Sequence, residues 1–433
     1  MRPPTLRRLI SPFSSPHKKV VLAQAIGQAS VLAATPVLGR LMPVHELGIY
    51  QTALAIALVL QPLATLRVDF VLPGVEDDAT ARQLLTRGRL AGVVLLTVAA
   101  LVGVLFVFLD NHDYAEIAVS AGVLALAYSW IALDGGQFLR TQALSALTAR
   151  NLASGLSAAV LQCAAALLFP TALALTAAIV LARVIAIAVS RSKAPRFVLT
   201  SGSANRATYP LGRTFRAVLS SLLDTSILQS LVLVPGTVLG PAAAGYAGMS
   251  QRITTSPASL VVGGMGQVAQ AKMSVSLRAG SSAMSSLRRA ALGLGIVAIS
   301  LGTLVALVAP LLVVPVLGPA WRPLQQLLPI TAPALAAQVL SLTLVPIGVM
   351  LRAEGKLLVV NLMRFAVIVG GTVAVALVSR DLVLTVSAWS AATTAGYIAQ
   401  LCFIFQAARR NDRAGVDQRD AEDTGASPAT SGV

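Results

Sequence analysis

The strongest constraint on this sequence is a series of long apolar runs. Each has about the 20 residues that a helix needs to cross the hydrocarbon core of a membrane. There are twelve of them, which begin near Val20, Leu47, Leu90, Tyr114, Leu152, Thr171, Ala217, Ala242, Ala290, Leu324, Leu357 and Leu382. Only 12% of the residues are charged, against about 25% in a soluble domain, which excludes a disordered chain and argues strongly against a soluble enzyme. The runs predict an all-α membrane protein with about 12 transmembrane helices.

The runs divide the chain into five regions. They are a basic tail (1–19), six runs (20–190), a polar and basic loop (191–216), six further runs (217–408), and a polar tail that we expect to be disordered (409–433). The first run follows basic residues, as the apolar part of a signal peptide does. Because it continues to about Leu38 and many similar runs follow, we interpret it as a membrane helix.

The distribution of basic residues predicts the orientation. The chain has 33 basic and 17 acidic residues and a net charge of +16. Most of the basic residues, Arg150 and Arg191 among them, lie on the side of the amino terminus, whereas the opposite loops contain only Arg40, Arg322 and Arg380. The positive-inside rule therefore predicts that both termini are cytoplasmic. The positive charge is mainly an orientation signal, and we expect no nucleic-acid partner.

Four arginines fall inside the predicted helices, namely Arg67, Arg183, Arg252 and Arg364. A charged group at membrane depth costs at least about 2–3 kcal/mol, so it usually faces a cavity or a partner. At about 1.5 Å per residue along each helix, Arg252, Arg364 and Asp224 lie near one level, between the middle and the cytoplasmic side of the membrane. These charges are the candidates for function.

Arginine at this depth suits an anionic cargo. Its planar guanidinium makes two parallel hydrogen bonds to phosphate and keeps its charge. We predict that Arg252 and Arg364 bind an anionic group of a substrate. Asp224 would pair with an arginine in the empty state, or serve as a proton or sodium site. The alternative is a purely structural ion pair between Asp224 and Arg252.

Two further arginines lie closer to helix ends. Arg67 and Asp69 are near the cytoplasmic end of the second helix, where they admit or gate the cargo, or where Arg67 extends to the interface. Arg183 lies two to three turns from the end of its helix. For Arg183 we favour extension to the interface over a binding role.

Glutamines accompany the arginines. Gln24 and Gln28 are four residues apart in the first helix, so they share one face. They either line a cavity and bind sugar hydroxyl groups, or form hydrogen bonds with a neighbouring helix. Gln251, next to Arg252, has the same two interpretations.

The two halves of the sequence contain a related pattern. Residues 36–51 read PVLGRLMPVHELGIYQ, and residues 235–246 read PGTVLGPAAAGY. In both, a helix ends, a turn rich in Gly and Pro follows, and Gly and Tyr open the next helix. The position of this pattern, between the first and second helix of each half, is the one expected for two parallel six-helix repeats.

Several segments resemble the bacterial polysaccharide flippases, which export O-antigen and capsule units. The segments are RLMPVHELGIYQTALAI followed by LATLRVDFVLP, then AGYAGMSQRITTSPASLVVGGMGQVAQAK at 244–272, and LGPAWRPLQQLLPITAP at 317–333. The resemblance covers about residues 20–405, in the same order and spacing. These flippases belong to the superfamily of multidrug, oligosaccharidyl-lipid and polysaccharide exporters.

The resemblance implies two six-helix bundles around a central cavity that alternates between the two sides of the cytoplasmic membrane. It implies a polyprenyl-diphosphate-linked oligosaccharide as cargo. Membrane lipids surround such a protein, and a glycan polymerase and glycosyltransferases would be its possible partners. Some members of the superfamily couple transport to ions, so proton or sodium coupling is possible, and no other cofactor is expected.

Two other classes remain as alternatives. A membrane glycan polymerase or ligase needs catalytic groups on a sizeable outer loop, and here Asp110 and Asp113 stand alone on a short one. No phosphate-binding loop for ATP is present in the sequence, so we predict that the chain is not an enzyme. A multidrug antiporter of the same superfamily would favour buried carboxylates over buried arginines.

Overall fold

The computed structural model describes residues 16–75, 77–194, 211–278, 282–350 and 354–423. Within these ranges the chain is helical and has no strand. The prediction of an all-α protein is therefore confirmed.

The first half of the chain is built from long helices joined by short turns. They are α2 (Pro16–Ala33), α3 (Thr35–Leu41), α4 (Val44–Thr65), α5 (Val68–Val71), α6 (Asp78–Phe108), α7 (His112–Arg140), α8 (Leu144–Leu168) and α9 (Ala172–Lys193). Pro36 lies in the first turn of α3, where the missing N–H would be unpaired in any case. Leu66 and Arg67 have φ angles of 50° and 53°. This pair of left-handed residues ends α4 and directs the chain into α5.

The second half repeats this construction. Its helices are α10 (Leu211–Val238), α11 (Pro241–Arg278), α12 (Ala283–Leu307), α13 (Ala309–Leu317), α14 (Leu324–Met350), α15 (Glu354–Phe365), α16 (Gly371–Ser379) and α17 (Leu382–Asp423). A π-helical turn, Ala366–Gly370, joins α15 to α16. Such turns are rare and are common at functional sites.

Eleven helices of the described chain are long and apolar enough to cross a membrane. The twelfth predicted span corresponds to α11, which is long but contains many Gly, Ser, Gln and Arg residues. Large apolar side chains cover the outer surface; Phe108 is 84% exposed and Val378 is 87% exposed. A surface of this kind fits lipid rather than water.

Two predicted boundaries differ from the structure. Helix α6 begins at Asp78, well before Leu90, because Asp77 caps it by accepting hydrogen bonds from the amides of Ala79 and Thr80. The hydroxyl and amide of Thr80 also hold the pKa of the Asp77 carboxyl below its usual value. A helix therefore continues past the apolar run that identifies it.

The second difference concerns the carboxyl-terminal tail. Helix α17 continues to Asp423, so the prediction of a disordered tail from residue 409 is wrong for residues 409–423. This segment contains Ala, Arg, Gln and Glu, which favour helix even where the composition is polar. Residues 1–15, most of the predicted loop 191–216 and residues 424–433 lie outside the described ranges.

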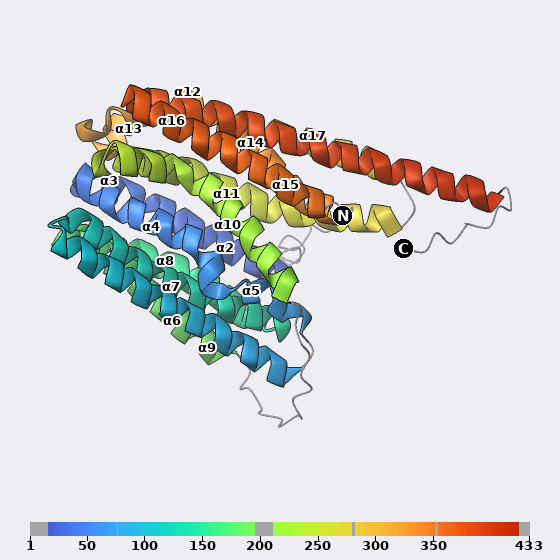
Figure 1. Cartoon of the computed structure of the whole chain (residues 1–433), viewed down its shortest axis with the longest axis horizontal. Coiled ribbons are helices and arrows are strands. Elements are labelled where there is room, and N and C mark those ends of the chain that lie inside the picture. Colours follow the sequence, from blue (N-terminus) through green and yellow to red (C-terminus); the bar gives the residue numbers. More distant parts are fainter. Residues whose placement is uncertain (1–15, 76, 195–210, 279–281, 351–353, 424–433) are drawn as a thin grey trace, which may run out of the picture.

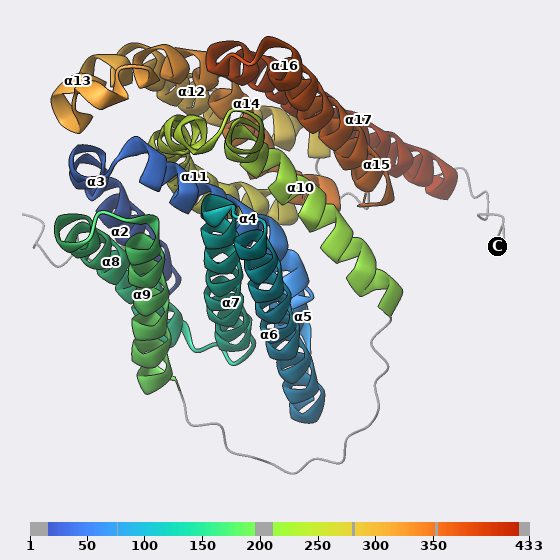
Figure 2. The same cartoon turned by 60° about the vertical axis from the view of Figure 1, so that its left-hand side comes forward.

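The helices of the two halves form two groups that meet along α4 and α11. Helix α4 packs against α10 and α11, α2 packs against α11, and α3 contacts α13. Figure 1 shows α3 and α13 together at one end of the molecule. Figure 2 shows the lower ends of α9, α6 and α10 spread apart at the other end. The two groups are thus joined at one end.

Direct contacts close the joined end. The indole Nε1 of Trp321 donates a hydrogen bond of 2.6 Å to the carbonyl of Gly39. Trp321 is fully buried, and its ring meets that of Tyr246 edge to face. Arg40 donates to the carbonyl of Val316 at 2.9 Å. We call this region the sealed end.

Two glycines allow the helices to approach closely at the sealed end. A Cβ atom on Gly48 would overlap the carbonyl oxygen of Pro241, and one on Gly245 would overlap the carbonyl oxygen of Val44. These glycines belong to the related patterns at residues 36–51 and 235–246. The two copies of the pattern therefore pack directly against each other, across the boundary between the halves.

Candidate functional site

A cavity of about 410 Å³ lies between the two halves. Its walls come from α2, α4, α7, α8 and α9 on one side and from α10, α11 and α14 on the other. Its polar lining consists of Tyr50, Gln51, Tyr128, Gln162, Arg183, Gln229, Gln251, Arg252, Thr255, Ser256, Ser259 and Gln338. Among the described residues, the lining contains two arginines and no carboxylate.

Arg252 reaches across this cavity from α11 to the other half. Its Nε donates to Thr35 Oγ1 at 3.1 Å. Its Nη2 donates to the carbonyl of Val31 at 3.0 Å and to Gln162 Oε1 at 2.8 Å. The amide of Gln162 in turn donates to the hydroxyl of Tyr50. Every one of these partners is neutral, so they satisfy donors of Arg252 without balancing its charge.

The alternative prediction of a structural pair between Asp224 and Arg252 is wrong. Asp224 instead lies 3.9 Å from Nη1 of Arg364. An estimate of depth along a helix contains no information on the direction in which each side chain points. Arg252 faces α2 and α8, whereas Asp224 faces α15.

A second cavity, of about 360 Å³, adjoins the first. Both are lined by Val31, Leu58, Tyr128 and Arg183. Gln24 and Gln28 line the second cavity together with Arg150 and Asn151. The two glutamines thus line a cavity, which is the position that their predicted role in binding sugar hydroxyl groups requires. Gln251 lines the first cavity, although its amide donates to the carbonyl of Leu228 in its own half.

Arg183 lines both cavities, so its predicted extension to the interface is wrong. Its guanidinium donates to the hydroxyls of Ser154 and Tyr128 and lies 4.5 Å from the centre of the Tyr128 ring. The guanidinium therefore binds polar groups inside the protein. Neither Ser154 nor Tyr128 stands out in the sequence as a partner of arginine.

Sequence reasoning missed the position of Arg150. Its place near the start of α8 led us to count it among the orientation charges. In the structure its Nη1 donates to the carbonyl of Ile131 on α7 at 3.0 Å. The absence of a side chain at Gly135 leaves room for this, because a Cβ there would overlap the guanidinium. A count of loop charges cannot identify a basic residue that turns inward.

Arg364 and Asp224 form a separate polar cluster in the second half. Arg364 is buried, donates to Asn361 Oδ1 at 3.1 Å, and lies over the ring of Tyr397. Asn361 also donates to Asp224 Oδ2 at 3.1 Å. The side chain of Asp224 is 42% exposed. Arg364 lines neither of the two cavities.

Arg67 and Asp69 are also apart from the cavities. Their closest charged atoms are 3.8 Å apart, and the Arg67 guanidinium lies over the ring of Phe70. The backbone of Asp69 packs against Gly136 of α7, where a Cβ would overlap its carbonyl oxygen. This pair therefore lies at the break between α4 and α5, and neither residue lines either of the two cavities.

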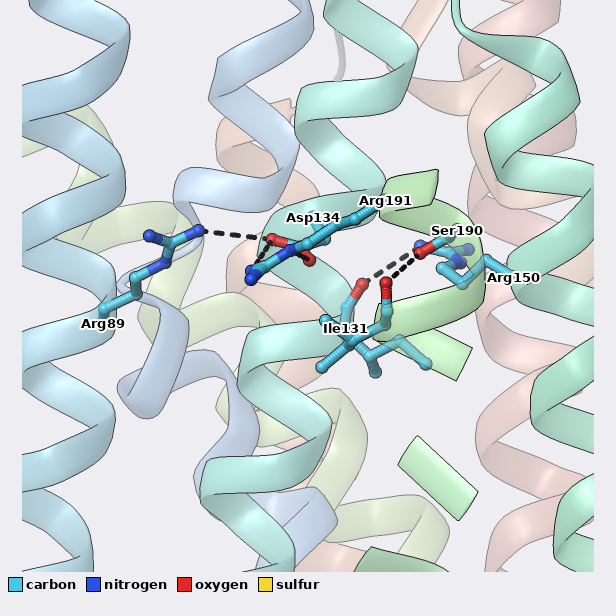
Figure 3. A network of polar contacts seen from close by, with 7 residues as sticks. Arg89, Ile131, Asp134, Arg150, Ser190 and Arg191 are labelled. Atoms are coloured by element: carbon cyan, nitrogen blue, oxygen red, sulfur yellow. Dashed lines mark hydrogen bonds and ion pairs between the residues drawn. The ribbon is translucent and has the colours of Figure 1, made fainter. Parts of the chain in front are cut away.

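A buried carboxylate that the sequence analysis missed lies on α7. Asp134 accepts hydrogen bonds from Nε and Nη2 of Arg191 at 2.9 and 3.1 Å, and from Arg89 at 3.3 Å. Figure 3 shows its carboxylate between these two guanidinium groups. The three residues join α6, α7 and α9. Asp134 had no distinguishing signal, because it is a single acid near a helix end that is rich in glycine.

Comparison with known proteins adds a family and a fold. Residues 37–326 match the family described as "Polysaccharide biosynthesis protein". No curated protein sequence matches the chain significantly.

Solved structures share the fold at low sequence identity. The lipid II flippase MurJ in an inward closed conformation has a TM-score of 0.62 and 10% identity, over 92% of this chain and 90% of that one. A eukaryotic MATE transporter has a TM-score of 0.59 and 14% identity, over 95% and 99%. An inward-facing multidrug resistance MATE transporter of the MOP superfamily has 0.53 and 14%, over 92% and 95%. The chain therefore has the fold of these membrane transporters.

Proposed function

Because the chain belongs to the polysaccharide biosynthesis protein family, we propose that it flips a polyprenyl-diphosphate-linked oligosaccharide across the bacterial cytoplasmic membrane. The cargo moves from the cytoplasmic to the outer leaflet by alternating access. Glycosyltransferases supply the cargo and a polymerase extends it on the other side. The chain itself performs no catalysis.

The observation that carries this proposal is the arginine-lined cavity. Arg252 enters it with only neutral hydrogen-bonding partners, and no carboxylate lines it in the part of the chain that the structure describes. A buried charge without a counter-ion is costly, and a diphosphate supplies the missing negative charge. The fork of arginine matches two phosphate oxygens. A cationic drug would meet repulsion at the same place, which disfavours a multidrug exporter.

The sealed end supports alternating access. Arg40, in the last turn of α3, and Arg322, just before α14, lie at this end; both belong to the few basic residues predicted to lie outside. With that orientation, the cavity is closed to the outer side and accepts cargo from the cytoplasm. Gln162, Thr35 and Val31 belong to the first half, so an anion that binds Arg252 competes with the hydrogen bonds that tie the halves together. Cargo binding would thereby loosen this tie.

We further propose that protons, rather than sodium ions, couple to flipping at Asp224. The guanidinium of Arg364 already lies where a cation would neutralise this carboxylate. Half exposure of Asp224 gives water access to it. Protonation would release Arg364 from its ion pair and leave Asn361 as its hydrogen-bonding partner.

Asp224→Asn is therefore expected to remove the dependence of flipping on a proton gradient, because an amide side chain, unlike a carboxylate, does not take up a proton at physiological pH. Flipping would be measured in proteoliposomes with and without an imposed pH difference, and with and without a sodium gradient. Asp381→Asn, at an exposed helix end, is the matched control and should retain the dependence. A gradient effect that persists in Asp224→Asn, or one that follows sodium, contradicts this coupling.

Gene deletion with complementation tests the proposed function. Loss of the protein is expected to remove the surface glycan and to leave lipid-linked units on the cytoplasmic leaflet. Normal surface glycan with increased drug sensitivity would instead identify a drug exporter. Single lipid-linked units that reach the outer leaflet but are not extended would identify a polymerase or ligase.

A further inference from the structure

We propose that the smaller cavity is a second anion site, which recognises an acidic substituent on the glycan, separately from the diphosphate bound at Arg252. The inference rests on the proposed function and specifies the cargo: a glycan with a carboxylate or phosphate group. Arg150 and Arg183 are the residues that recognise this group.

Arg150 is held in place by neutral groups only. Its Nε and Nη2 donate to Asn151 Oδ1 at 3.2 and 3.0 Å, and its Nη1 donates to the carbonyl of Ile131. Gly135 provides the space beside it. These contacts fix the direction of the guanidinium and use three of the five N–H groups of arginine, so two remain for a ligand.

Arg183 is less completely satisfied. Its Nη atoms donate to Ser154 and Tyr128, but its Nε is buried and has no hydrogen-bond partner among the described residues. A buried donor without a partner costs about 1–3 kcal/mol. An anion in the cavity would accept this hydrogen bond and balance the charge.

The carboxylate on the neighbouring α7, Asp134, interacts with Arg150 over a distance, but its direct partners are two other arginines. Figure 3 shows Asp134 between Arg89 and Arg191, whereas Arg150 points to the carbonyl of Ile131. Asp134 thus already has two cationic partners. None of the described residues that line either cavity has a carboxylate. One carboxylate shared among these arginines leaves the smaller cavity with a net positive charge.

The other side chains of the smaller cavity suit a sugar that carries the acidic group. Gln24, Gln28 and Asn151 line the smaller cavity and offer amide groups to sugar hydroxyls. A cavity of about 360 Å³ is within the size range of small-ligand sites.

Binding of three matched probes to the purified full-length chain tests this site. The probes are short-chain polyprenyl diphosphate disaccharides that end in a neutral hexose, a uronic acid or a phosphorylated hexose. The unmodified protein should bind at least one acidic probe about tenfold more tightly than the neutral probe, as expected for one additional charge-assisted contact. The preferred probe identifies whether the substituent is a carboxylate or a phosphate.

Variants then assign the preference to the smaller cavity. Arg150→Gln and Arg183→Gln should lower the affinity for the preferred acidic probe about tenfold and leave that for the neutral probe unchanged. Arg150→Lys and Arg183→Lys should keep part of the preference, which guards against misfolded variants. Arg289→Gln, an exposed arginine of α12, is the control and should bind all probes as the unmodified protein does.

Two results would overturn the proposal. One is equal binding of all three probes by the unmodified protein. The other is an equal loss for neutral and acidic probes in the arginine variants. Both would leave the flippase function intact, because the neutral probe still binds through its diphosphate. If none of the probes binds, the proposed function fails as well.

Discussion

Replacing Gly48 with alanine is expected to open the sealed end and to slow flipping by roughly tenfold to a hundredfold. The new methyl group would overlap the carbonyl oxygen of Pro241, so α4 and α11 must separate. Overpacking of this kind costs about 1–3 kcal/mol. In the alternating-access cycle that we propose, this contact belongs to the closed arrangement, so the cost falls on that state and shifts the equilibrium between the closed and open states by about the stated factor.

The opening can be measured as thiol labelling from outside. Leu317, which is buried at the sealed end against Gly39, is changed to cysteine in a chain whose Cys163 and Cys402 are replaced by serine. An impermeant maleimide should label this cysteine faster in Gly48→Ala than in the parent. Gly293→Ala is the matched control, because nothing lies within 4 Å of the added methyl group in α12. Equal labelling in the two glycine variants would show that the glycine contact does not close this end.

Much of the fold was predictable because helix span and apolar length are local properties of the chain. The predicted starts at Leu324 and Leu382 coincide with those of α14 and α17. The packing between the two halves could not be predicted in the same way. The patterns around Gly48 and Gly245 were recognised as related, but the sequence does not reveal that the two copies contact each other.

The candidate site was predicted only in part, since a sequence gives the depth of a side chain better than its direction. Arg252, Gln24 and Gln28 were singled out, and all three line a cavity. Arg364 was predicted to bind the same cargo, but it points into a separate cluster with Asn361. Arg150 was missed because it lies near a helix end, where a basic residue normally serves orientation.

Arg252→Gln is expected to reduce flipping by about tenfold to a hundredfold while the protein still reaches the membrane. The variant loses charge-assisted hydrogen bonds to the diphosphate, each worth about 1.5–3 kcal/mol. The flipping rate of Arg252→Lys should lie between those of the unmodified protein and Arg252→Gln, because lysine keeps the charge but not the planar guanidinium. Rates would be measured in proteoliposomes with a fluorescent lipid-linked glycan, and membrane abundance would be measured in parallel.

A change at Gln162 separates cargo binding from a purely structural link. Gln162→Glu places a carboxylate where Arg252 now donates at 2.8 Å, so it strengthens the tie between the halves and supplies the counter-ion internally. If Arg252 binds the diphosphate, this carboxylate competes with the cargo, and flipping should fall as it does in Arg252→Gln. If Arg252 only links α11 to α8, Gln162→Glu should flip cargo at least as fast as the unmodified protein. The two variants thus have the same expected loss of flipping for different reasons. In Arg252→Gln the cation is absent, and in Gln162→Glu the cation is already neutralised by the protein.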